Sequence, residues 1–317
     1  MNPHRLRAYI YLITVAVIWG LAAPVIKFTL GGIDPLPFLA YRFTIASIFS
    51  LAFFLVKIAR GKKFKYLRAN LGLATVYGLL AIPIALGVLF VGLDKSTVLD
   101  LALIGVVGPM IVSLGGAFFF RDHITKREKI GIAIVVFGVA LNSISPIFGT
   151  DIKFKLAGNL LLLIYLLADS ASILIAKRLV QVKIKSANLT NLAFLIGAAT
   201  LIPITTVVYG FDNLIKMITT LPFQYHLGVW YMALFSGSLA YFLFVRAQRS
   251  IEVSEATLFN YLQPIFSVPL AIFWLGEKIS TSFILGAVLI TIGLIFAEYK
   301  KSNSKLITNS LKPQLKT

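Results

Sequence analysis

A single carboxylate lies within a long apolar run near the middle of the chain. Asp169 stands between Leu160 and Ala176, in a run made mostly of Leu, Ile and Ala. If this run is a helix that crosses a bilayer, its rise of about 1.5 Å per residue places Asp169 near mid-membrane. A charge at that depth costs about 2.5–3.5 kcal/mol on insertion scales, so such a residue by default marks an ion, proton or substrate pathway. The alternative is a structural Asp, satisfied by Tyr165 and Ser172 on the same helix face or by a basic partner.

Other polar and aromatic side chains fall at similar depths in neighbouring apolar runs. We expect three deep aromatic residues to form the walls of a cavity: Trp19, Tyr77 and Tyr241. A polar cluster on a later run could hydrogen-bond a small molecule: Asn260, Tyr261 and Gln263. The alternative for this cluster is polar packing between helices, worth about 0.6 kcal/mol per hydrogen bond.

Three prolines stand inside the apolar runs: Pro83, Pro109 and Pro264. A proline removes a helical hydrogen bond, and in a membrane the freed carbonyl must be satisfied by a neighbour or face a cavity. Interruptions at corresponding places in two halves of a chain point to a binding site, and Pro109 and Pro264 meet that condition.

Two basic side chains also fall within apolar runs, Lys27 and Arg42. Arg42 could attract an anionic group or pair with an acid across the bundle. We favour a structural role for Arg42, as an ion pair or by snorkelling to the surface. Lys27 lies closer to its surface, so snorkelling explains it still better.

The composition excludes several classes of protein and site. Of 317 residues, 58% are hydrophobic and 13% charged, with a mean hydropathy of +0.90, whereas soluble domains carry about 25% charged residues. The chain has no cysteine, and its three histidines lie far apart, so we expect no metal site and no cofactor. The net charge of +18 sits in short clusters between apolar runs, which indicates membrane orientation rather than nucleic-acid binding. No catalytic motif or paired intramembrane carboxylate is present, so an enzyme is not expected.

Ten apolar runs are long enough to cross about 30 Å of hydrocarbon as helices. They are 8–29, 36–57, 70–91, 97–119, 130–148, 156–176, 188–209, 227–247, 254–275 and 280–298. With both termini in the cytoplasm, 23 of the 30 Lys and Arg residues fall in cytoplasmic segments and 5 in external ones. This bias follows the positive-inside rule, so we predict an all-α integral membrane protein with ten helices in this orientation.

The chain contains an internal repeat. The segment from Pro109 to Gly138 has a counterpart 155 positions later, from Pro264 to Gly293. Five helices is an odd number, so the second half enters the membrane with the opposite orientation, and the halves form an inverted repeat. We predict two five-helix repeats, 8–148 and 156–298, followed by a disordered, basic cytoplasmic tail at 299–317.

Paired residues of the two halves have different expected roles. Two glycine pairs each share one helix face and favour close packing, within the bundle or between protomers: Gly131 with Gly138, and Gly286 with Gly293. Asp122 and Glu277 stand in corresponding turns, where we expect them to order helical hairpins. Around the first helix of each half an offset of 150 fits, which puts Trp19 opposite Asp169.

Short motifs follow one another in a fixed order along the chain. The first half carries Trp19-Gly20, Pro24, Lys27, Pro35 and Arg42-Phe43, and the second half carries Tyr241 and Arg246-Ala247. Both halves repeat the series of Pro, acid, Thr or Ser, Gly and Gly. In these motifs the chain resembles the EamA-type, ten-helix members of the drug/metabolite transporter superfamily, over roughly residues 8–298. The resemblance implies a secondary transporter of small metabolites, often an exporter, with a central cavity lined mainly by helices 1, 3, 4, 6, 8 and 9.

We therefore expect a multi-pass transporter of the cell membrane that exports a small metabolite, such as an amino acid, by alternating access around a midplane cavity. Protons are the candidate coupling ion because Asp169 is ionisable. A multidrug or cation exporter that binds its substrate at Asp169 is one alternative, and a structural or lipid-handling membrane protein is another. The expected partners are a small-molecule substrate and membrane lipid, without nucleic acid, and the expected assembly is a monomer or homodimer.

Overall fold

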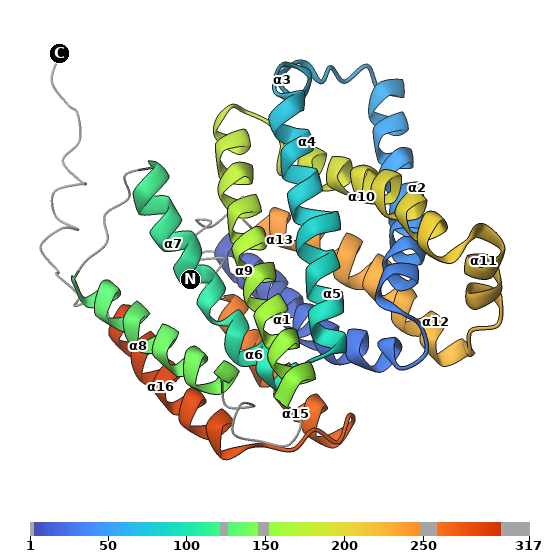
Figure 1. The fold of residues 1–317 in the computed structure, drawn as a ribbon. Helices are drawn as coiled ribbons and strands as arrows, with labels where there is room; N and C mark the ends of the chain where they lie inside the picture. The colour runs from blue at the N-terminus through green and yellow to red at the C-terminus, as the bar shows by residue number, and fades with distance from the viewer. Residues whose placement is uncertain (1–2, 121–125, 145–151, 248–258, 299–317) are drawn as a thin grey trace, which may run out of the picture.

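The computed structural model describes residues 3–120, 126–144, 152–247 and 259–298 (Figure 1). These residues form helices joined by short loops, and no strand occurs among them. The predicted tail at 299–317 and the turn at Asp122 lie outside the described residues.

The helices of the first half are α1 (Pro3–Leu30), α2 (Pro35–Ala59), α3 (Lys65–Ala69), α4 (Leu71–Leu79), the π-helix η1 (Leu80–Leu86), α5 (Gly87–Asp94), α6 (Val98–Gly105), α7 (Val107–Phe120) and α8 (Lys126–Ile144). Those of the second half are α9 (Ile152–Gln181), α10 (Ser186–Tyr209), α11 (Phe211–Thr219), α12 (Phe223–Trp230), the π-helix η3 (Tyr231–Leu239), α13 (Ala240–Ala247), the 3₁₀ turn η4 (Phe259–Leu262), α15 (Gln263–Phe273) and α16 (Thr281–Glu298). The short amphipathic helix α11 was not predicted.

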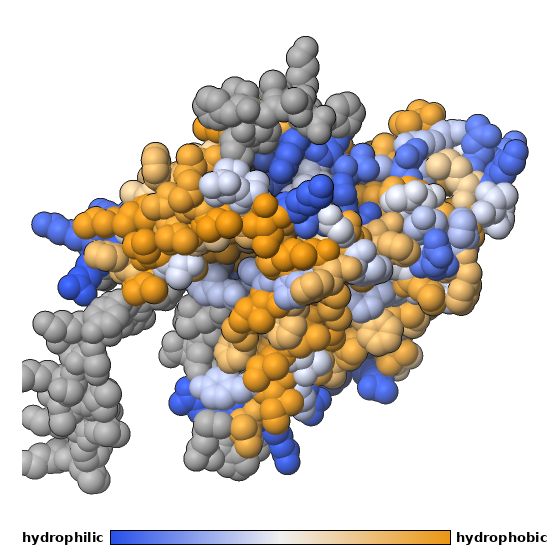
Figure 2. Space-filling model, turned by 90° about the horizontal axis from the view of Figure 1, so that it is seen from below, coloured by the Kyte–Doolittle hydropathy of each residue, from blue (hydrophilic) through white to orange (hydrophobic). Residues whose placement is uncertain are grey.

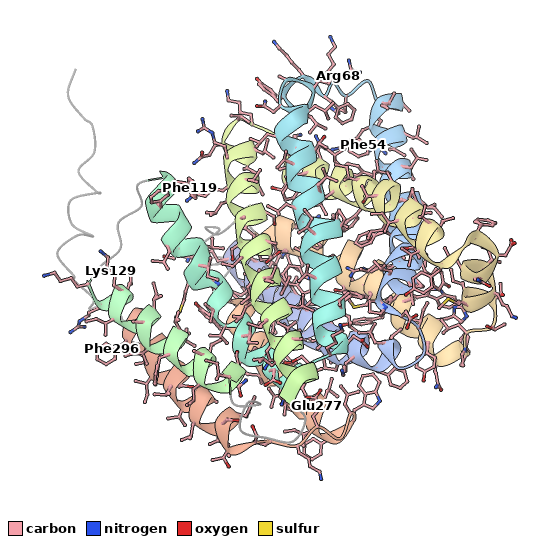
Figure 3. All side chains as sticks on the ribbon, viewed as in Figure 1. Phe54, Arg68, Phe119, Lys129, Glu277 and Phe296 are labelled. Carbon is pink, nitrogen blue, oxygen red and sulfur yellow. The ribbon has the colours of Figure 1, made fainter. Side chains whose placement is uncertain are left out.

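Seven of the described helices, some built from consecutive segments, are long and apolar enough to cross a membrane. Two shorter apolar helices cover 259–273 and 281–296, and α8 overlaps the predicted span 130–148 but begins with charged residues. Each of the ten predicted spans thus overlaps helical structure within the described residues, while the count of ten crossings and the orientation stay predictions. Arg68 and Glu277, predicted to lie on opposite sides of the membrane, lie at opposite ends of the bundle (Figure 3).

Large apolar side chains cover much of the outer surface. Phe118, Val207 and Phe273 are 80%, 85% and 87% exposed. Extended apolar areas are visible on the face seen from below, with hydrophilic residues gathered mainly toward its margins (Figure 2). Such exposure suits a hydrocarbon solvent, because apolar patches of this extent are rare on soluble monomers.

The fifth helices of the two halves, α8 and α16, pack closely side by side (Figure 1). A Cβ added at Gly293 would lie 2.7 Å from the Gly131 carbonyl oxygen. A Cβ at Gly138 would lie 3.1 Å from the Gly286 oxygen, and the reverse distance is the same. The repeated glycines therefore bring two helix backbones together within the bundle, which is one of the two predicted settings.

The central helices are interrupted at related places in the two halves. The π-helix η1 contains Pro83, and the π-helix η3 lies in the corresponding helix of the second half. The helix containing Pro109 is divided at Val106 into α6 and α7, and Pro264 stands in the first turn of α15, directly after η4. π-Helices are rare and frequently mark functional sites, so these interruptions direct attention to the neighbouring side chains.

Candidate functional site

Asp169 lies inside the bundle with three tyrosines around it. It projects from α9 and interacts electrostatically with the hydroxyl groups of Tyr77 on α4, Tyr165 on α9 and Tyr241 on α13. Tyr241 is 37% exposed, and the other three side chains are partly exposed. The structure thus brings together four residues that the sequence placed on three separate runs.

The carboxylate of Asp169 has no partner among the described residues, since no hydrogen bond or ion pair reaches it there. Ser172, which the structural alternative assigned to it, instead donates its hydroxyl to the backbone oxygen of Asp169 at 2.7 Å. Tyr165 lies within electrostatic reach of the Asp169 carboxylate, but no hydrogen bond between the two side chains occurs among the described residues. An unpaired carboxylate at this depth is costly, which favours the functional interpretation of Asp169.

Trp19 forms one wall beside this group. Its ring centroid lies 5.3 Å from that of Tyr241, and its indole N–H donates to the Ser236 carbonyl oxygen at 3.1 Å. Ser236 belongs to the π-helix η3, where Ser238 also donates to the Ala233 oxygen at 3.2 Å. Backbone carbonyl groups of the π-helix η3 therefore accept hydrogen bonds from side chains. In the interior of a membrane every backbone polar group needs such a partner. Trp19 and Asp169, predicted to be repeat equivalents, both interact with Tyr241, Trp19 through a ring contact and Asp169 electrostatically.

Arg42 interacts with the same tyrosine, and neither predicted form of its structural role, snorkelling or an ion pair, is found among the described residues. Its side chain is only 5% exposed, so it does not snorkel, and no described acidic side chain pairs with it. The guanidinium carbon lies 5.1 Å from the ring centroid of Phe43 and 5.9 Å from that of Phe90, and its Nη1 atom is buried without a hydrogen-bond partner. Arg42 also interacts electrostatically with Tyr241.

The polar cluster on the ninth helix lies on the α1 side of the bundle. Gln263 donates to the Asn260 side chain at 3.2 Å, and Tyr261 is partly exposed. The backbone oxygen of Gln263 comes so near α1 that a Cβ at Gly20 would lie 2.9 Å from it. Because Gly20 follows Trp19, this cluster borders the aromatic wall, yet no hydrogen bond among the described residues joins it to Asp169.

Glu277 joins the two halves at one end of the bundle, which the topology predicts to be external. Its carboxylate accepts from the backbone N–H groups of Val98 and Leu99, at 2.8 and 3.0 Å, and so caps the N-terminus of α6. Lys27 donates to the carbonyl oxygens of Leu93 and Asp94 at the end of α5, both at 2.8 Å, and interacts electrostatically with Glu277. Glu277 therefore does more than order its own hairpin: it fixes a helix of the other repeat.

A network of buried polar side chains lies around Asp100, in the first turn of the helix that Glu277 caps. Asp100 accepts from Thr97 at 2.8 Å and from Asn142 at 2.7 Å, and pairs with Lys155 at 3.2 Å. Ser96 is 3% exposed and donates to Asn159. Together with Glu277 and Lys27 these groups link helices of both halves at this end of the bundle.

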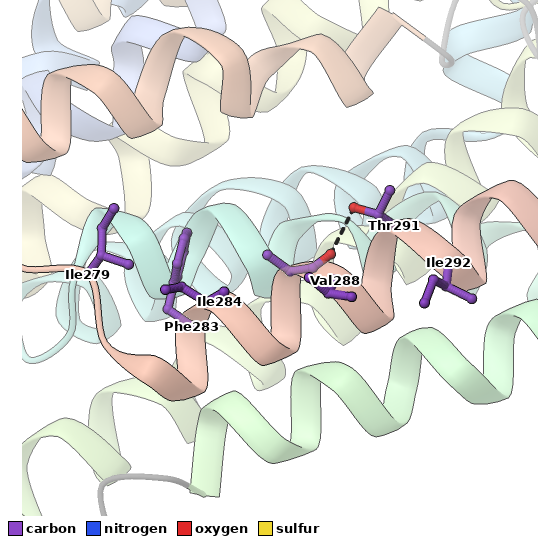
Figure 4. A pocket seen from close by; sticks show the side chains of 7 residues that line it. Ile279, Phe283, Ile284, Val288, Thr291 and Ile292 are labelled. Atoms are coloured by element: carbon purple, nitrogen blue, oxygen red, sulfur yellow. Dashed lines mark hydrogen bonds between the residues drawn. The ribbon is translucent and has the colours of Figure 1, made fainter.

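An apolar pocket lies away from the Asp169 group, along the outer side of α16 (Figure 4). Its lining residues are Ile279, Phe283, Ile284, Ala287, Val288, Thr291 and Ile292. The only hydroxyl among them, on Thr291, donates to the Ala287 oxygen at 2.8 Å. This pocket therefore offers no free polar group for recognising a solute.

The EamA-like transporter family matches the chain twice, at residues 6–144 and 156–299. The chain belongs to this family. Among curated relatives, the transporter YyaM of Bacillus subtilis is 26% identical over 92% of this chain and 94% of its own length. The inner membrane transporter YedA of Escherichia coli is 26% identical over 85% and 83%, and a probable amino-acid metabolite efflux pump of Salmonella typhimurium is 25% identical over 88% and 91%.

The fold also has a counterpart among solved structures. One crystal structure superimposes with a TM-score of 0.61 at 17% identity, covering 92% of this chain and 97% of that one. Together with the seven apolar helices, the family match establishes that the protein is a multi-pass membrane transporter.

Sequence reasoning missed part of this site. It did not predict the aromatic surroundings of Arg42 and Tyr241: Phe43 and Phe90 lie beside the guanidinium, and Phe194 lies beside Tyr241. The adjacent Arg42-Phe43 pair was the available signal, because a buried cation needs either an acid or an aromatic face. The π-helix η3 contains no proline, so no residue type in it predicts the irregular geometry.

Proposed function

We propose that this transporter exports a small metabolite, such as an amino acid, and binds it at the group formed by Asp169, Tyr77, Tyr165, Tyr241 and Trp19. The observation that carries the proposal is the carboxylate of Asp169, which lies inside the bundle beside partly exposed tyrosines without a bonded partner. Ligand sites typically combine apolar and aromatic walls with a few converging polar groups, and this group has that character. The relative named as a probable amino-acid metabolite efflux pump supports the substrate class and the direction.

The transport cycle we propose is alternating access between two related halves. Support comes from the repeat in the sequence, from the interruptions at related places, and from the contact of the fifth helices through glycines of both halves. In the proposed cycle, the cap of α6 by Glu277 holds the end that is predicted to be external in its closed state. Protons are the proposed coupling ion, taken up and released by Asp169.

A second candidate is export of an organic cation. A free carboxylate next to Trp19 and three tyrosines also suits a positively charged, partly apolar compound, through ion pairing and cation–π contact. The two candidates differ in one respect, because only a metabolite such as an amino acid brings a carboxylate of its own.

Metabolite release from cells tests the proposed function. Cells that overproduce the protein are expected to accumulate one or a few amino acids in the medium, several-fold above cells that produce an equal amount of the Asp169→Asn variant. Mass spectrometry of the medium identifies the solute. Unchanged media, together with resistance of the cells to lipophilic cations, would favour the cation exporter instead.

A further inference from the structure

A second unpaired charge lies near the proposed substrate site. Arg42, on α2, is 5% exposed, and its guanidinium touches the rings of Phe43 and Phe90 but no described acid. Nη1 of Arg42 is buried without a hydrogen-bond partner. A buried cation without a counter-charge is as costly as the unpaired carboxylate of Asp169, so one explanation should cover both.

Arg42 and Asp169 both act electrostatically on Tyr241, but they do not form an ion pair with each other. Each interacts electrostatically with Tyr241, yet no described nitrogen of Arg42 lies within ion-pair distance of the Asp169 carboxylate. Phe194 extends the wall, with its ring 5.8 Å from that of Phe43 and 6.1 Å from that of Tyr241. The two opposite charges thus stand on helices α2 and α9, and both act on Tyr241, whose ring belongs to an aromatic row that reaches Phe43 beside Arg42.

We propose that Arg42 and Asp169 are the two poles of one substrate site, with Arg42 receiving a carboxylate and Asp169 an ammonium group. The substrate is then a zwitterion, such as a free α-amino acid, and its two charges satisfy both unpaired groups at once. A guanidinium suits this role because it binds a carboxylate through two parallel hydrogen bonds. The aromatic wall from Trp19 to Phe194 accommodates an apolar side chain. This inference rests on the proposed function. It assigns zwitterions as the substrate class and Arg42 as a further binding residue.

Charge-altered analogues of one amino acid test the assignment in proteoliposomes. Leucine serves as the zwitterion, leucinamide lacks the carboxylate, and N-acetylleucine lacks the ammonium group. In the wild type, leucine should be transported faster than either analogue. In Arg42→Gln, the ratio of leucine to leucinamide transport should fall by at least about 10-fold, because a charged hydrogen-bond donor to the carboxylate is lost. In Asp169→Asn, the ratio of leucine to N-acetylleucine transport should fall by a similar factor.

Ratios within one variant cancel differences in protein yield and folding. Arg42→Lys is expected to recover part of the leucine preference, and Lys62→Gln, at an exposed position, should leave both ratios unchanged. Wild-type ratios in Arg42→Gln would overturn the assignment of Arg42 while leaving the transporter function intact. Transport of leucinamide alone by the wild type would also overturn it and would favour the cation exporter. Absence of any flux in the wild type would instead refute the proposed function.

Discussion

The Asp169→Asn variant is expected to lose at least about 90% of the transport rate. Asparagine has nearly the shape of aspartate but cannot pair with an ammonium group or release a proton. The loss of one charged hydrogen bond is worth about 1.5–3 kcal/mol, and about 1.4 kcal/mol corresponds to a tenfold change in rate. Initial rates of amino-acid uptake into proteoliposomes, measured from pH 5 to about 9, should be low and nearly independent of pH.

The variant should fold normally, because removing a charge from the interior of a membrane lowers the cost of insertion. Asp212→Asn is a matched control, since Asp212 is exposed on α11. Its rates and pH profile should equal those of the wild type. A wild-type profile in Asp169→Asn would refute the role of Asp169 in both binding and coupling.

The Glu277→Ala variant is expected to open the closed end of the bundle more often. Alanine leaves the N–H groups of Val98 and Leu99 without their acceptor and removes the negative charge near Lys27. Loss of such a cap costs about 1–2 kcal/mol, which corresponds to roughly a 5–30-fold rise in the open population. Because the chain has no cysteine, a single thiol introduced as Ser96→Cys reports this opening without background. Its reaction with a membrane-impermeant maleimide should accelerate by that factor.

Two substitutions and the pH dependence control this experiment. Lys278→Ala alters the neighbouring exposed residue and should leave labelling unchanged.

Burial raises the pKa of Glu277, although the two backbone N–H groups and Lys27 act to lower it. The closed end therefore binds a proton more readily than an open end with Glu277 in water, so acidic pH should favour closure. Glu277→Gln, which keeps an acceptor oxygen without the buried charge, should label as slowly as the wild type. Rapid labelling of Glu277→Gln, or slow labelling of Glu277→Ala, would contradict the capping role.

Much of the fold could be predicted from the sequence, because apolar length alone determines where a chain can cross a bilayer. Helical structure coincides with every predicted span, and the repeated glycines indicated where helix backbones meet. The interruptions were harder to predict. Pro83 signals the π-helix η1, but η3 depends on contacts such as the indole of Trp19 with the Ser236 oxygen, which no local pattern reveals. The capping of α6 by Glu277 likewise joins positions 179 residues apart.

The sequence was enough to select the residues of the candidate site, but not to show which of their charges are paired. Depth within an apolar run was enough to select Asp169, Tyr77, Tyr165, Tyr241 and Trp19, because an ionisable or polar side chain is costly there. Whether a charge is paired depends on helices distant in sequence. The sequence therefore did not reveal that Arg42 lies against phenylalanine rings rather than against a described acid.

Counterflow across a proteoliposome membrane tests the central claim most directly, because a carrier with one alternating site must exchange solute between its two faces. Vesicles containing the wild-type protein are loaded with unlabelled leucine and diluted into a trace of labelled leucine. We predict a transient accumulation of label above the external concentration, absent from vesicles that contain Asp169→Asn. Passive equilibration of the label without such an overshoot, or an equal overshoot in both proteins, would contradict alternating access at the Asp169 site.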